Sequence, residues 1–180
     1  PIDVFRSQRT LADPDLFQQY MIASNLLEGF REERFRTSDV FDVESLAKYI
    51  ALCDLFGTSH SLNSNNFRFY YNPITSLLEP VPFDLDAGRK LVKLAGTYRP
   101  EDDHRFAGGG KALLLSNLFS DLDFYSAYVK NLQRFAEPAY LEDLHQTVKD
   151  ELREKLQIIY KEWPAYRFSW DVLSENQRYI

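Results

Sequence analysis

Cysteine is nearly absent from the chain, so covalent cross-links within it are excluded. It contains one cysteine, Cys53, so neither an internal disulfide nor a multi-cysteine zinc site can form. Cys53 sits in an apolar helical pattern, which favours a buried thiol over a nucleophile. No apolar run approaches the roughly 20 residues that span a bilayer. No signal peptide opens the sequence either.

Positive charge is also scarce. The chain has 21 Lys and Arg against 27 Asp and Glu, a net charge of −6. Binding to a nucleic-acid backbone needs a broad positive surface. We therefore expect no nucleic-acid partner, and no membrane span in this stretch of sequence.

Apolar residues, in contrast, are plentiful. They make up 44% of 180 residues, and aromatic residues make up 15%, a composition typical of a folded globular domain. We expect residues 1–180 to form a single domain. Because the sequence starts with Pro1 rather than Met, we interpret it as a fragment of a larger protein from which a lobe is missing.

Helical periodicity dominates most of the chain. Asp13-Pro14 is a typical helix start, Gly57 a typical helix end, and Pro138 and Pro164 bracket a long apolar stripe that we interpret as core. Residues 87–110 contain Gly, Pro and charge with few apolar anchors, and we expect a mobile loop there. The expected helices cover 14–28, 43–56, 125–132, 138–163 and 170–176.

One short region alternates like a strand pair. Phe67, Phe69 and Tyr71 recur with period two, and Asn72-Pro73 begins a turn. On the returning segment Leu77, Val81 and Phe83 share a face, while Pro80 and Pro82 restrict it to a sheet edge. The sequence therefore predicts a mainly α fold with a small antiparallel β-hairpin, an α+β class.

The hairpin also places oxygen-bearing side chains together. Asn66 would enter the first strand and Asp84 would leave the second, so both lie at the same end of the ribbon, with Asp86 just beyond. Mg²⁺ commonly takes one or two carboxylates, and substrate phosphates and waters complete its shell. We interpret Asn66, Asp84 and Asp86 as candidate metal ligands. The alternative is that the aspartates only end the strand, since Asp is common in turns.

His60 is the candidate for acid–base chemistry. It lies in the polar loop before Asn66, and the unperturbed pKa of histidine is near neutrality. The alternative is a hydrogen-bonded loop histidine with no catalytic role.

These residues resemble the CotH kinase family, atypical protein kinases first known from bacterial spore coats. The resemblance covers most of the chain, and the loop and hairpin are its specific part. The similar segments are the helix 42–56, the loop 60–66, the strand 67–71, the segment 78–86 and the helical remainder 113–179.

The resemblance implies the C-terminal lobe of such a kinase. Asn66 and Asp84 would bind Mg²⁺ or Mn²⁺ and, through the metal, ATP, and Asp86 is a further ligand candidate. In the family an aspartate five residues before the asparagine orients the acceptor hydroxyl, and here that position is Ser61. The expected locations are a spore coat, the cell surface or the exterior.

Three functions follow as hypotheses. The first is a Ser/Thr protein kinase that acts on a partner protein in its full-length form, with this fragment inactive alone. The second is a pseudokinase-like module that binds proteins without catalysis, which Ser61 favours. The third, ranked last, is a metal-dependent hydrolase using His60, Asp84 and Asp86.

Overall fold

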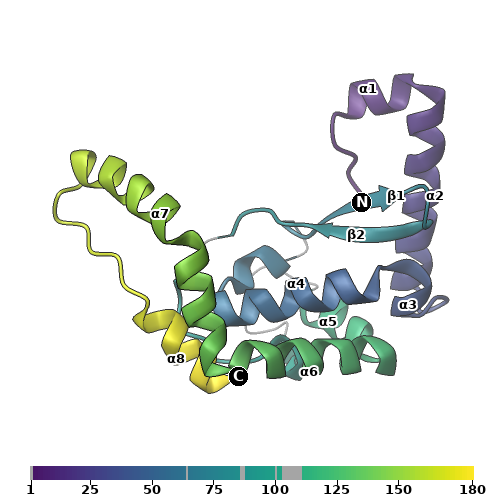
Figure 1. The fold of residues 1–180 in the computed structure, drawn as a ribbon. Helices are drawn as coiled ribbons and strands as arrows, with labels where there is room; N and C mark the ends of the chain where they lie inside the picture. Colours follow the sequence, from purple (N-terminus) through teal and green to yellow (C-terminus); the bar gives the residue numbers. More distant parts are fainter. Residues whose placement is uncertain (1, 64, 86–87, 100, 103–110) are drawn as a thin grey trace.

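The computed structural model describes residues 2–63, 65–85, 88–99, 101–102 and 111–180. It is mainly helical with one small two-stranded antiparallel sheet, which confirms the predicted α+β class. Figure 1 shows the arrangement. The elements are α1 (Ser7–Ala12), α2 (Pro14–Arg31), α3 (Thr37–Val40), α4 (Val43–Phe56), η1 (Ser59–Leu62), β1 (Arg68–Asn72), β2 (Leu77–Val81), η2 (Ala95–Thr97), α5 (Lys111–Phe119), α6 (Leu122–Ala136), α7 (Pro138–Glu162) and α8 (Asp171–Tyr179).

Helix α4 is the centre of the core. Asp42 caps its start by accepting a hydrogen bond from Ser45 N at 2.8 Å. Gly57 ends it in the left-handed conformation, with φ 64°. In Figure 1 the helix lies between the hairpin and α6, and it contacts both. Its fully buried apolar residues are Leu46, Ala47, Ile50, Ala51 and Leu55.

The hairpin packs one face on this core. Tyr71 pairs with Leu78 and Phe69 with Pro80, so these residues share the inner face. Leu78 is buried, whereas Val81 is 40% exposed. The face shared by Leu77, Val81 and Phe83 is thus the outer one. The core contact is made by Leu78, which the sequence pattern had not assigned to a face.

The segment after the hairpin is fastened to α4 rather than loose. Leu91, Ala95 and Tyr98 are buried. Asp54 of α4 accepts hydrogen bonds from Ala95 N at 3.1 Å and from the Tyr128 hydroxyl of α6. The prediction of few apolar anchors over 87–110 is therefore wrong for residues 88–99, and residues 87, 100 and 103–110 lie outside the described ones.

Two further details differ from the sequence prediction. Helix α2 continues past Gly29 to Arg31. Gly29 is buried against the ring of Phe35, where a Cβ would lie 2.3 Å from two ring carbons, so this glycine serves close packing rather than the helix end. In α7, Leu141 is the one buried residue. The stripe on this helix is therefore not core along its length, and Figure 1 shows the second half of α7 extending away from α4 and α6.

Candidate functional site

The predicted site residues from the loop and the hairpin meet at one end of the hairpin. The last strand pair is Arg68 with Val81, so a continuation of the pairing brings residue 66 close to residue 84. The Asn66 amide Nδ2 donates to Asp84 Oδ2 at 3.1 Å. His60 reaches the same oxygen, with Nε2 to Oδ2 at 3.1 Å. His60, Asn66 and Asp84 therefore form one cluster.

Local backbone structure explains this meeting. Thr58 and Gly57 end α4, and the chain makes one turn of 3₁₀ helix, η1, which carries His60. The next turn is closed by hydrogen bonds from Asn66 N and Phe67 N to Asn63 O at 2.8 and 2.9 Å. Asp84 has φ 51°, a left-handed conformation that Asp tolerates better than most residues.

The cluster has a defined hydrogen-bond order. His60 Nδ1 lies 3.2 Å from Asn63 Nδ2, an amide that can only donate. With the Asn63 amide in this orientation, His60 accepts at Nδ1, and its Nε2 faces Asp84 Oδ2 at 3.1 Å. Both ring nitrogens are engaged in this arrangement, which matches the alternative of a hydrogen-bonded loop histidine. The side chains of His60 and Asp84 are each 48% exposed, so the cluster is open to solvent.

The atoms of the cluster would suit a hard cation if the Asn66 amide rotated. Asn66 Nδ2 also donates to the His60 carbonyl oxygen at 3.3 Å, so an amide N–H group bridges two oxygens. Rotating the Asn66 amide by 180° places Oδ1 where Nδ2 now lies. The Asn66 oxygen, the His60 carbonyl oxygen and Asp84 Oδ2 would then face one another. That arrangement is repulsive alone and favourable around Mg²⁺, which prefers oxygen ligands.

The remaining predicted ligand, Asp86, lies outside the described residues. Among the described residues, no group of three or more His, Cys, Asp or Glu side chains could hold a metal ion. The oxygens available are therefore those of Asp84, Asn66 and the His60 carbonyl. The hydrolase hypothesis needs Asp86 as well, and its ligand set is incomplete among the described residues.

Ser61 points away from the cluster. It is fully buried, its hydroxyl donates to Thr58 O at 2.7 Å, and it lies 3.4 Å from Cys53 Sγ. At the position where the resemblance implies an acceptor-orienting aspartate, this side chain is part of the core.

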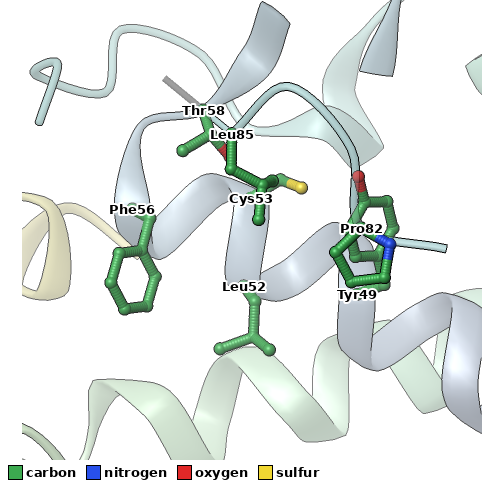
Figure 2. Close-up of a pocket in the computed structure, with 7 residues that line it drawn as sticks. All are labelled: Tyr49, Leu52, Cys53, Phe56, Thr58, Pro82 and Leu85. Carbon is green, nitrogen blue, oxygen red and sulfur yellow. The ribbon is translucent and has the colours of Figure 1, made fainter. Parts of the chain in front are cut away.

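A half-open cavity of about 320 Å³ lies between α4 and the chain that leaves β2. Cys53 lines it and is buried as predicted, and this burial raises the pKa of its thiol. Figure 2 shows the α4 side chains beneath the loop that carries Pro82 and Leu85. The lining residues are Tyr49, Leu52, Cys53, Phe56, Thr58, Pro82 and Leu85.

Sequence reasoning missed Asn63, the residue that fixes the His60 ring. Its position three residues after His60 on a short turn was the available signal, because side chains at that spacing meet on a 3₁₀ helix. It also missed Asn176 of α8, which holds the segment following the site and gave no local signal.

No family model, curated protein or solved structure matched the chain. Among the described residues, no helix combines the length and apolar character needed to cross a membrane. The residue geometry is thus the basis for any statement about function.

Proposed function

We propose that the cluster of His60, Asn66 and Asp84 binds a divalent cation, Mg²⁺ or Mn²⁺, and through it the phosphates of ATP. The chain would then be the metal- and nucleotide-binding lobe of a CotH-type atypical protein kinase. The observation that carries the proposal is the meeting of Asn66 and Asp84 at 3.1 Å, from segments 18 residues apart.

The chemistry of the cluster supports this function. Asp84 uses Oδ2 for both of its hydrogen bonds, which leaves Oδ1 without a donor among the described residues on a side chain that is half exposed. Mg²⁺ keeps several waters and often binds through one or two carboxylates together with substrate phosphates. A site with few protein ligands is therefore suited to a metal–nucleotide complex rather than to a bare ion.

A second function, binding without phosphoryl transfer, is favoured by one observation. Ser61 is buried and hydrogen-bonded to Thr58 O, so its hydroxyl is not available to a substrate at the cluster. Phosphoryl transfer needs a group that orients the attacking oxygen. His60 is the group nearest to that role, and it is engaged with Asp84 and Asn63. A pseudokinase that holds nucleotide and docks a protein needs neither.

Calorimetric titration tests the metal site. Mn²⁺ is titrated into the chain with and without a non-hydrolysable ATP analogue, and the analogue should tighten Mn²⁺ binding. Asp84→Asn keeps the size and the hydrogen-bond acceptor but removes the charge, so we expect binding to weaken at least tenfold. Asp150→Asn is the control, because that side chain is exposed on α7.

A kinase assay with the full-length protein then separates the two functions. Transfer of phosphate from ATP to a protein that His60→Ala abolishes would support the enzyme. Nucleotide binding without transfer would support the pseudokinase. Mn²⁺ binding that is equal in the parent and in Asp84→Asn would refute both.

A further inference from the structure

The cavity between α4 and the chain that leaves β2 has the properties of a second binding site. Its volume of about 320 Å³ is roughly twice that of an apolar protein cavity that binds benzene, ~150 Å³. Leu52, Phe56, Pro82 and Leu85 give it apolar walls, and none of the described charged side chains lines it. This lining suits a molecule that is neutral and mainly apolar.

Within the described part of the chain, two buried hydroxyls in its lining lack a well-formed hydrogen bond. Tyr49 is 8% exposed and Thr58 is 2% exposed. Among the described residues, neither Tyr49 Oη nor Thr58 Oγ1 makes a well-formed hydrogen bond, although buried polar groups in proteins are nearly always paired. A ligand that brings one hydrogen-bonding group would satisfy either of them.

The nearby polar groups are already engaged. The Ser61 hydroxyl donates to Thr58 O at 2.7 Å and lies 3.4 Å from Cys53 Sγ. Burial raises the pKa of Tyr49 to about 12 and also raises that of Cys53, so the lining stays uncharged near neutral pH. This matches a neutral ligand and argues against a nucleotide, whose phosphates need charge or a metal.

We propose that this cavity binds a small neutral aromatic or aliphatic molecule that carries one hydrogen-bonding group, with phenol as its simplest representative. The site is separate from the metal cluster, because its lining residues exclude His60, Asn66 and Asp84. It is independent of the proposed kinase-like function.

A matched series of probes tests the proposal. Phenol, toluene and benzoate have the same ring and differ in a hydroxyl, a methyl group and a carboxylate. Binding is followed by amide chemical-shift changes in the full chain. We expect phenol to bind about tenfold more tightly than toluene, the value of one additional buried hydrogen bond. Benzoate should not bind.

Two kinds of variant assign the site. Leu85→Trp fills the cavity from a half-exposed position that tolerates a larger side chain, and it should abolish phenol binding. Tyr49→Phe and Thr58→Val retain shape while removing one hydroxyl each, and at least one should reduce the preference for phenol over toluene to near unity. Both variants remove an unpartnered buried hydroxyl, so they should fold.

Three results would overturn the proposal. Shift changes that avoid the lining residues or persist in Leu85→Trp would show that phenol binds elsewhere. A preference for phenol that survives both hydroxyl variants would refute the role of Tyr49 and Thr58. Displacement of phenol by ATP without metal would show that the cavity belongs to the nucleotide site.

Discussion

Replacing Asn176 with alanine tests how the segment after the candidate site is held. Asn176 of α8 is 1% exposed. Its amide oxygen accepts from Leu91 N at 2.7 Å, and its amide nitrogen donates to Leu55 O at 3.0 Å and Arg89 O at 2.9 Å. One side chain thereby joins the end of α4, the segment following Asp84, and the last helix.

The expected cost follows from the groups left behind. Asn176→Ala removes the partners of one backbone N–H and two carbonyls, and a buried polar group without a partner costs about 1–3 kcal/mol. Water entering the space recovers part of this, so we expect a loss of about 3–5 kcal/mol in the free energy of unfolding. That is a large share of the roughly 5–15 kcal/mol typical of a domain.

Urea denaturation followed by circular dichroism measures this loss. Gln146→Ala is the control, because Gln146 is exposed on α7 and its side chain bonds the exposed Glu142. It should change stability by less than about 0.5 kcal/mol. A loss below about 1 kcal/mol for Asn176→Ala would refute the conclusion that this amide holds the segment.

Four more substitutions probe the fold. A Cβ on Gly57 would lie 1.8 Å from the Arg89 carbonyl oxygen at φ +64°, whereas one on Gly88 at φ +96° meets nothing within 4 Å. Gly57→Ala should therefore lower the free energy of unfolding, measured by thermal unfolding, by more than about 2 kcal/mol, and Gly88→Ala by about 1 kcal/mol. Equal losses would contradict the clash at Gly57. Tyr128→Phe leaves Asp54 without its hydroxyl donor and should cost about 1–3 kcal/mol by urea unfolding, so an unchanged stability would count against this network. Burial raises the pKa of Asp121, but hydrogen bonds from Ser38, Asp123 and Phe124 outweigh it and hold that pKa below its usual value. The stabilisation by the Asp121 carboxylate is thus present above about pH 4 and is lost as pH falls through the folded-state pKa. Asp121→Asn should therefore flatten the acid limb of a curve of unfolding free energy against pH. An unaltered acid limb would refute this role.

The features that sequence predicted well are set by neighbouring residues. Asp42 and Gly57 bound α4 because capping and the left-handed end need a particular residue type locally. The hairpin followed from alternation around the Asn72-Pro73 turn. Its pairing in turn brought Asn66 to Asp84, so that part of the candidate cluster was accessible from sequence.

The features that sequence missed depend on distant partners. Asp54 and Asn176 form hydrogen bonds to the segment 88–98 across 41 and 85 residues of chain. No local sequence pattern predicts hydrogen bonds between residues so far apart. Leu77 and Leu78 are both apolar, so periodicity alone could not say which faces the core. The stripe on α7 is helical in spacing, but whether another element covers it is a tertiary property.

The same limit applies to chemistry at the candidate site. Sequence placed His60 and Ser61 side by side, but only the fold directs His60 to Asp84 and Ser61 into the core. The directions in which the His60 and Ser61 side chains point bear on whether the site is interpreted as catalytic or as a binding site.

Paramagnetic broadening by Mn²⁺ tests the central claim most directly, because it maps the bound ion onto the chain. With substoichiometric Mn²⁺ and the ATP analogue, we predict that amide signals around His60, Asn66 and Asp84 broaden first and that Asp84→Asn prevents it. Broadening confined to acidic surfaces elsewhere, such as α7, or unchanged in Asp84→Asn, would contradict the metal site.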